Sequence, residues 1–266
     1  MFIFRRPAYR FAQEAVHACG GGLARSRAAD NKAMTKIILI PGLACGAEMW
    51  QSQVTALPAK YRAHVTDAHT RADTIEDMAC RLLDEHPGDL ILCGASMGGI
   101  VAMEAVRQAP QRIRGLALLG TNARPETDEL RRLREAAITL FADGRMAEVL
   151  RANVPLAFHP SRAGDTLLVR AYLDFVMKAG HEQLIRQNRA IMARPDARPH
   201  LPAVSCPTLV LCGDGDQLTP PECSREIANL IPGATLVMVP QCGHMLTMEH
   251  PDLVNAALSQ WLRQLK

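Results

Sequence analysis

The chain has 266 residues, of which 48% are hydrophobic, and it carries a formal net charge of +3 at pH 7. A chain of this length can build one full hydrophobic core and one inserted segment. The small charge argues against a nucleic-acid partner, and no apolar run approaches the roughly 20 residues of a membrane-spanning helix. We therefore expect neither nucleic-acid binding nor stable membrane insertion, and the oligomeric state is left open.

The first 33 residues differ from the rest of the chain in charge. They hold six Lys or Arg residues against two acidic ones, and three consecutive glycines interrupt them at 20–22. An arginine-rich targeting segment is one interpretation of this composition. We favour a poorly ordered N-terminal extension, because Met34-Thr35-Lys36 leads directly into an apolar run.

Short apolar runs bounded by Gly, Pro or Asp predict buried β-strands in the remaining chain. They lie at 36–40, 63–66, 89–93, 115–119, 208–212 and 235–239. Helical patterns separate most of these runs, which is typical of a mainly parallel sheet with helices on both faces. The predicted fold class is therefore α/β.

Two helices carry local start signals. Asp73 and Glu76 have the spacing of a capping box, and the helical pattern that follows them ends at His86-Pro87-Gly88. Near the C-terminus, Pro251 precedes another helical pattern and is expected in its first turn.

Residues 122–205 break the alternation of strands and helices. They contain helical patterns at 130–141 and 182–193 but no convincing strand. Such a length is unusual for a simple connection between two strands. We predict an α/β core formed by 34–121 and 206–266, with 122–205 inserted as a helical cap. A second independent domain is disfavoured because the α/β pattern resumes afterwards.

The eight cysteines lie mostly inside apolar runs and show no paired Cys-x-x-Cys spacing. This pattern favours reduced, buried thiols in a cytoplasmic protein over disulfides. No metal site and no organic cofactor are predicted.

The most informative motif is Gly94-Ala95-Ser96-Met97-Gly98, which lies between a predicted strand and a helical pattern. A tight strand-to-helix turn exposes the serine hydroxyl, and glycines two residues away on either side avoid collisions across the turn. Because a serine hydroxyl is a weak nucleophile, it needs a base that takes its proton. Ser96 is the predicted nucleophile.

An acid and a histidine follow in the order expected of such a site. Asp214 and Asp216 both follow the strand at 208–212, and Asp216 is favoured because Asp214 is closer to the strand and fits a turn residue. Among nine histidines, His244 follows Gly243 in a short loop after the last predicted strand. We predict Asp216 as the acid and His244 as the base.

Acyl transfer also needs hydrogen-bond donors for the oxyanion. The backbone N–H groups of Met97, directly after the serine, and Leu43, in the loop after the first strand, are the candidates.

Together these motifs are similar to those of the α/β-hydrolase superfamily, in its small capped serine hydrolase or esterase type. The resemblance runs from Lys36 to the C-terminus and includes Ile40-Pro41-Gly42-Leu43 and Thr219-Pro220. It implies the same roles for Ser96, Asp216, His244, Leu43 and Met97. Two departures are expected to matter: Pro41 stands where many relatives have a histidine, and no extra hairpin precedes Lys36, which predicts a shortened sheet.

The predicted function is hydrolysis of an ester or related acyl bond of a small molecule through a Ser-His-Asp triad and an acyl-enzyme. A C–C bond hydrolase or an acyltransferase could use the same residues. A ligand-binding module with little turnover is the alternative from another class. Phe141, Phe158, Tyr172 and Phe175 lie among the helical patterns of the cap, where they could line a substrate pocket or form the cap's own core.

Overall fold

The computed structural model describes residues 35–265, so the predicted extension at 1–33 lies outside the described residues. A six-stranded sheet runs through the described chain in the order β2-β1-β3-β4-β5-β6, and all neighbouring strands are parallel. The strands are β1 (Lys36–Ile40), β2 (His64–Val65), β3 (Leu90–Ala95), β4 (Ile113–Leu119), β5 (Thr208–Gly213) and β6 (Thr235–Val239). The predicted α/β fold class is confirmed.

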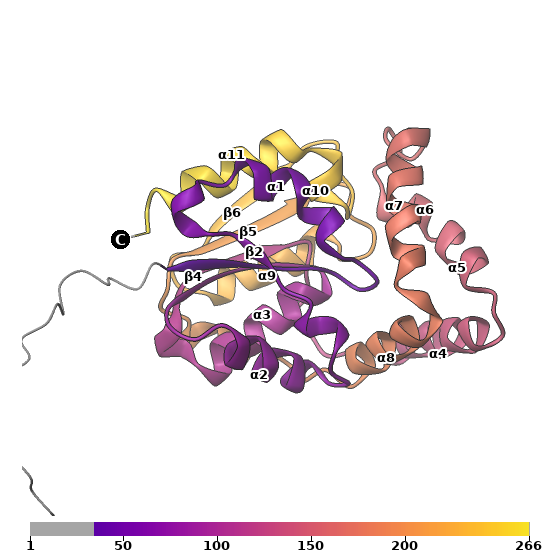
Figure 1. The fold of residues 1–266 in the computed structure, drawn as a ribbon, viewed down its shortest axis with the longest axis horizontal. Coiled ribbons are helices and arrows are strands. Elements are labelled where there is room, and N and C mark those ends of the chain that lie inside the picture. Colours follow the sequence, from indigo (N-terminus) through magenta and orange to yellow (C-terminus); the bar gives the residue numbers. More distant parts are fainter. Residues whose placement is uncertain (1–34, 266) are drawn as a thin grey trace, which may run out of the picture. The chain divides into compact units, whose positions relative to one another are not determined.

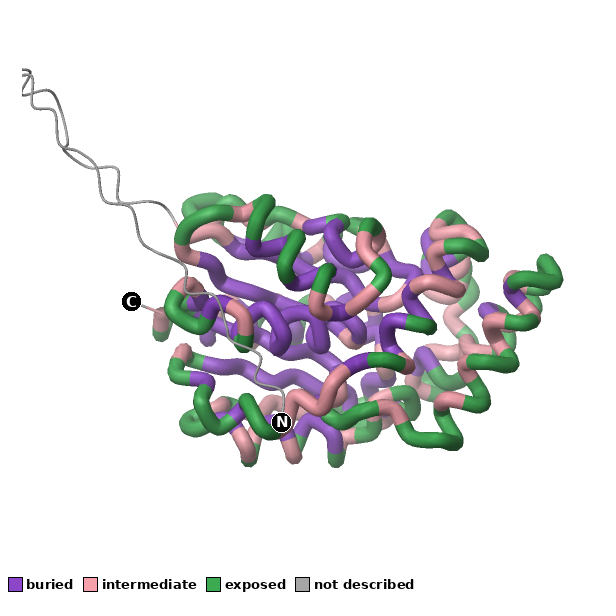
Figure 2. Tube along the Cα trace, turned by 90° about the horizontal axis from the view of Figure 1, so that it is seen from below, coloured by how far each residue is buried: buried purple, intermediate pink, exposed green. Residues whose placement is uncertain are grey.

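Helices cover both faces of this sheet (Figure 1). Helices α1 (Gln51–Ala56) and α11 (Pro251–Leu262) lie on one face, and α2 (Ile75–Glu85), α3 (Met97–Gln108) and α9 (Pro221–Leu230) lie on the other. Alternate strand residues supply the two cores: Ile37 and Leu39 belong to the first, Ile38 and Ile40 to the second. Because both faces are covered, the inner strands β1, β3, β4 and β5 are buried along most of their length, while the edge strands β2 and β6 are partly exposed (Figure 2).

The sheet differs from the prediction mainly in strand length. Strand β2 pairs only with β1 and has two residues, whereas β3 and β4 each have two neighbours and extend beyond the predicted bounds. Short edge strands such as β2 are common in native sheets, whereas β6, at the other edge, keeps the five predicted residues 235–239.

A run of helices connects β4 to β5. It comprises α4 (Asp128–Ala142), α5 (Met146–Ala152), α6 (Val154–Ala157), α7 (Thr166–Lys178) and α8 (Gly180–Met192), followed by a short 3-10 turn at Leu201–Ala203. We call 122–205 the helical insertion. It lies beyond the carboxyl ends of the strands (Figure 1).

Buried ion pairs join the two ends of the helical insertion. The Glu126 carboxylate, near its start, contacts Arg134 at 2.5 Å and Arg194, near its end, at 3.0 Å. Both ends of the inserted segment are thereby fixed to the same carboxylate.

Within residues 35–265, none of the helices combines the length and apolar character needed to cross a bilayer.

Helix α2 begins one residue later than the capping-box pattern predicts. The N-cap is Thr74, whose side chain accepts the Asp77 N–H at 3.0 Å, and the Asp73 side chain is 82% exposed. Thr74 and Asp77 have the same three-residue spacing as Asp73 and Glu76, so the sequence offers two starts. The later start is the one with the capping bond.

We expect Thr74→Ala to lower the free energy of unfolding by about 1 kcal/mol, the usual contribution of an N-cap side chain. Urea denaturation measures this change as a lower midpoint with an unchanged slope. Asp73→Ala is the matched control and should stay within about 0.5 kcal/mol of the wild type, as exposed substitutions do. The reverse order of the two effects would contradict the assigned cap.

Candidate active site

Ser96 lies between the end of β3 and the start of α3, with φ 52° and ψ −118°. Few side-chain-bearing residues adopt a positive φ, and such strain costs about 1–3 kcal/mol. Two hydrogen bonds fix the turn: the Ser96 N–H donates to the Leu119 carbonyl at 2.9 Å, and its carbonyl accepts from Thr121 Oγ1 at 2.7 Å. The strained conformation therefore depends on the end of the neighbouring strand β4.

The glycines around Ser96 are needed for close backbone approach. A Cβ at Gly94 would overlap the carbonyl of Gly98, and a Cβ at Gly98 would overlap the carbonyl of Ile40 at the end of β1. The turn thus packs directly on the strand that precedes the predicted oxyanion loop.

Asp216 and His244 lie within hydrogen-bonding distance of each other. His244 Nδ1 is 2.9 Å from Asp216 Oδ2 and 3.1 Å from Oδ1. Since a carboxylate only accepts, Nδ1 carries the proton, and Nε2 is left able to accept one. The Asp216 carboxylate also accepts the N–H groups of Leu218 and Thr219, both at 2.9 Å, and the Thr219 hydroxyl at 2.8 Å.

Asp214, the alternative acid, is placed differently. It lies in the turn after β5, and its side chain accepts the backbone N–H of Cys242 at 3.3 Å. Of the two candidate acids, the structure brings Asp216 to the histidine.

The segment Leu119–Gly120–Thr121 links the serine to this acid–histidine pair. While Leu119 and Thr121 bind the Ser96 backbone, Gly120 lies on the pair with φ 48°. A Cβ at Gly120 would stand 3.1 Å from Asp216 Oδ2 and 3.5 Å from His244 Nδ1. The segment 119–121, at the end of β4, therefore bonds Ser96 and lies beside Asp216 and His244.

The electrostatic environment stabilises the charged forms of both partners. Burial alone would raise the pKa of Asp216, but the adjacent His244 and the hydrogen bonds from His244 and Thr219 lower this pKa below its usual value. Burial alone would lower the pKa of His244, but the Asp216 carboxylate, its hydrogen bond and the charge of Glu249 raise this pKa above its usual value. The imidazolium is favoured, as a base that receives a proton requires.

A second buried carboxylate organises the histidine loop. Glu249, 3% exposed, accepts the N–H groups of Gly243 at 3.0 Å, Met245 at 3.1 Å and His159 at 2.8 Å. His159 belongs to the helical insertion, and the nearby Ala157 carbonyl accepts the His244 N–H at 3.0 Å. The backbone on both sides of His244 is thus fixed by Glu249 and by the insertion.

Of the amides at 42–45, in the loop after β1, one has no internal acceptor. Gly42 N–H donates to Met49 Sδ at 3.4 Å, Ala44 N–H to Gln187 Oε1 at 2.9 Å, and Cys45 N–H to the Gly42 carbonyl at 3.1 Å. Among the bonds of the described residues, the Leu43 N–H has no acceptor. The loop lies beside the serine, since a Cβ on Gly42 would be 3.3 Å from Ser96 Cβ.

Three of the four aromatic residues singled out in the insertion stack on one another. Tyr172 meets Phe158 edge-on at 5.3 Å and Phe175 edge-on at 5.6 Å between ring centroids. All four aromatic residues, Phe141 included, are buried in the same core cluster as Cys45 and Met245. The apolar core of the insertion is therefore continuous with the core under the site loops.

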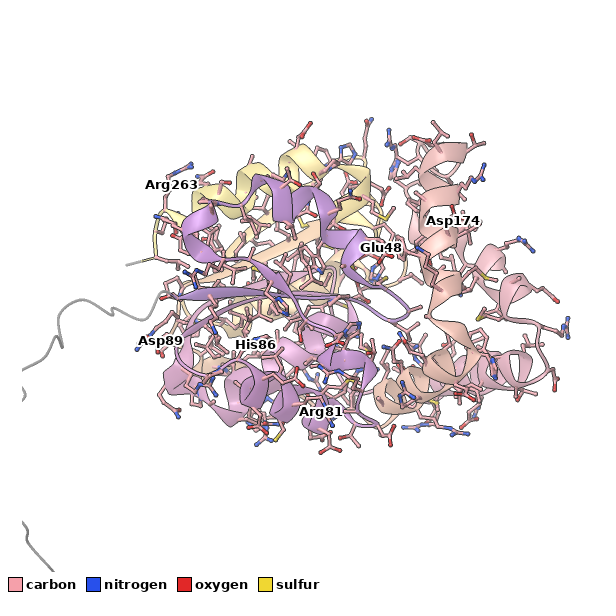
Figure 3. The ribbon with its side chains drawn as sticks, in the orientation of Figure 1. Glu48, Arg81, His86, Asp89, Asp174 and Arg263 are labelled. Carbon is pink, nitrogen blue, oxygen red and sulfur yellow. The ribbon has the colours of Figure 1, made fainter. Side chains whose placement is uncertain are left out.

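A cavity of about 550 Å³ opens where α7 faces the core, and its lining includes Glu48, Met49, Leu168 and Met248. Glu48 lies at the edge of the core that faces α7 (Figure 3), and it pairs with Lys178 of that helix at 3.4 Å. Met49 is both a wall of this cavity and the acceptor of the Gly42 N–H. The cavity and the loop that carries Leu43 thus have Met49 in common.

A parallel sheet with a strained serine turn at the end of a central strand, and an acid–histidine pair on the same edge, defines the α/β-hydrolase fold. The model of the Alpha/beta hydrolase family matches residues 37–257, and the chain belongs to this family. The predicted membership of the superfamily is confirmed, and the protein is an α/β-hydrolase enzyme.

Individual relatives are moderately similar. RutD of Yersinia enterocolitica, named for carbamate hydrolysis, is 26% identical, over 88% of this chain and 89% of its own. The pimeloyl-(acyl-carrier protein) methyl ester esterase of Nitrosomonas europaea is 26% identical, over 81% of this chain and 91% of its own. The structure of a thermophilic esterase from Thermogutta terrifontis superposes with a TM-score of 0.78 at 28% identity, over 87% and 90% of the two chains.

The sequence did not point to several residues around the site. Gly120 and Thr121 lie against the predicted site residues themselves, whereas Glu249 and Gln187 bond the residues next to His244 and Leu43. Glu249 had one signal, an acidic residue in the largely apolar stretch that follows His244. Gln187 had none, because its partner Ala44 is 143 positions away.

We expect Glu249→Gln to destabilise the fold by about 1–3 kcal/mol, because its amide group would leave at least one buried N–H unpaired. Chemical denaturation measures the loss. Glu48→Gln is the matched control, with an exposed ion pair that contributes about 0–1 kcal/mol. Equal stability of the two variants would contradict the role given to Glu249.

Proposed function

We propose that this enzyme is a serine hydrolase that cleaves an ester, or a closely related acyl bond, of a small molecule. The observation that carries the proposal is the turn 119–121, which contacts the strained Ser96 on one side and the Asp216–His244 pair on the other. The relatives named as esterases support the ester as the bond type.

In the proposed reaction, Ser96 Oγ attacks the acyl carbon while His244 Nε2 takes the hydroxyl proton. Asp216 holds the imidazole tautomer and stabilises the imidazolium that forms. The proton then passes to the leaving alcohol as the acyl-enzyme is made. A water molecule, activated by the same imidazole, releases the acid and restores the serine.

Leu43 and Met97 are the proposed oxyanion donors. The Leu43 N–H lacks an internal acceptor among the described residues, and Met97 is the first residue of α3, where a backbone N–H has no partner within the helix. Donors aimed at the developing oxyanion are commonly worth about 10²- to 10³-fold in kcat.

The proposed substrate class is a small acyl compound, and the helical insertion acts as the cap that selects it. The buried aromatic residues Phe158, Tyr172 and Phe175 give the insertion an apolar face toward the site loops, which favours an apolar acyl or alcohol part. A carbamate carbonyl fits the same chemistry, and the similarity to RutD makes it the second bond type to test. Cytoplasmic location remains a prediction from the cysteine pattern.

Ser96→Ala should lower kcat for p-nitrophenyl esters, from acetyl to octanoyl, by about 10⁴-fold or more, as loss of a nucleophile does. A fluorophosphonate probe should label the wild type and not this variant. Ser205→Ala, at an exposed position before the amino end of β5, is the control and should keep wild-type rates, because the candidate site lies at the carboxyl ends of the strands. A wild type that neither turns over any ester or carbamate nor reacts with the probe would favour the ligand-binding alternative.

Wild-type kcat/KM should fall at low pH with an apparent pKa above the usual histidine value, because Asp216 favours the protonated, inactive base. Asp216→Asn removes that charge, so burial should shift the fall in kcat/KM to lower pH. The same variant should lower kcat by about 10³- to 10⁴-fold. Asp214→Asn is the control and should leave the acid limb in place. The pH profile of residual ester hydrolysis measures both effects. An unshifted profile in Asp216→Asn, or a shifted one in Asp214→Asn, would contradict the choice of Asp216 as the acid.

A further inference from the structure

We propose that Gln187, on helix α8 of the insertion, is a positioning residue that selects the active conformation of the loop 42–45. The inference rests on the proposed function, since it concerns the donor Leu43 of the same site. In this proposal, a residue of the helical insertion holds in place the loop that carries the oxyanion donor Leu43.

Gln187 is fully buried and uses both ends of its amide. Its Oε1 accepts the Ala44 N–H at 2.9 Å, and its Nε2 donates to the His69 carbonyl at 3.1 Å. The side chain therefore bridges the loop after β1 and the turn after β2. Neither contact belongs to the core of the insertion itself.

His69 closes the arrangement from the other side. Its Nε2 lies 3.0 Å from the Cys45 carbonyl, and as that oxygen only accepts, Nε2 carries the proton. His69 is 1% exposed, and burial lowers the pKa of its imidazole, which keeps the ring neutral. The amide of Ala44 and the carbonyl of Cys45 are thus both bonded to this buried pair.

The geometry of the loop explains why such a support is needed. The Cys45 N–H bonds the Gly42 carbonyl, so 42–45 is a β-turn, and Ala44 at its third position has φ 60°. Turns with positive φ at this position favour glycine, and an alanine there is strained by its Cβ. Alanine instead favours the turn in which the central peptide is flipped and φ is negative.

The central peptide of this turn is the Leu43–Ala44 peptide, and it is held at both of its polar atoms. Gln187 accepts its N–H, and the Cys45 thiol donates to its carbonyl at 3.3 Å. Flipping this peptide would relieve Ala44 but would leave the Gln187 oxygen unpaired in a buried place. Gln187 therefore selects the positive-φ turn and tethers it to α8, and this tether holds the Leu43 backbone in its place beside Ser96.

The test compares Gln187→Met with the wild type and with Asn188→Leu. Asn188 is the buried neighbour on α8, and its bonds, to Arg134 and to the Leu184 carbonyl, stay within the insertion. We expect Gln187→Met to lower kcat for a p-nitrophenyl ester by about 10- to 100-fold, with KM little changed. This loss is smaller than the about 10²- to 10³-fold fall in kcat that follows removal of a whole oxyanion donor. The Ki of a trifluoromethyl ketone, whose adduct places an oxyanion in the hole, should rise by the same factor.

Asn188→Leu should lower stability without changing kcat or this Ki at temperatures where it is folded. Rescue is the decisive readout: Ala44→Gly added to Gln187→Met should recover much of kcat, because glycine adopts the positive φ without strain. If Gln187→Met does not fold, Gln187→Glu replaces it. Burial favours the neutral acid, which can accept and donate as glutamine does, so this variant should keep kcat within about tenfold.

Several results would overturn the inference while leaving the proposed function intact. They are a folded Gln187→Met with wild-type kcat and Ki, equal losses in Asn188→Leu, no rescue by Ala44→Gly, or a folded Gln187→Glu with kcat down about 100-fold or more. A wild type without turnover or probe labelling would instead remove the proposed function on which the inference rests.

Discussion

The turn at Ser96 is the constraint on which the rest of the site depends. A side-chain-bearing residue at φ 52° persists only where its surroundings hold it, and here two strands do so. Strand β3 lies between β1 and β4, so the turn packs on the Ile40 carbonyl on one side and bonds to Leu119 on the other. The loops after these two strands therefore flank the serine: one carries Leu43 and the other carries Gly120.

The parallel topology then brings the acid and the histidine to the same edge. Strands β5 and β6 follow β4 in the sheet, and Asp216 and His244 lie in the loops after them. Parallel strands end on one side of a sheet, so residues far apart in sequence meet there without any special local pattern. Fine placement requires more: Gly120 leaves room for the Asp216–His244 pair, and Glu249 fixes the backbone around the histidine.

Residues in local motifs could be predicted from the sequence, and residues that act across the fold could not. The glycines around Ser96 and the apolar runs of the strands are short-range signals, because turn sterics and burial restrict the residue types at neighbouring positions. Thr74 shows the limit of such signals, since two capping patterns overlap and the bond decides between them. Gln187 and Glu249 are polar residues whose role is to accept hydrogen bonds from buried backbone N–H groups. For Gln187, that N–H group lies more than a hundred positions away in the sequence.

The contacts of the helical insertion also limit how it can move. It bonds the loop 42–45 through Gln187 and the histidine loop through the Ala157 carbonyl and the His159 N–H, on two different sides of Ser96. Glu126 joins its two ends through buried ion pairs with Arg134 and Arg194. A motion that lifted the insertion as one body would break all of these bonds and disturb both loops that serve the serine. A motion that keeps these bonds is confined to other parts of the insertion, with α8 and the segment 157–159 staying on the core.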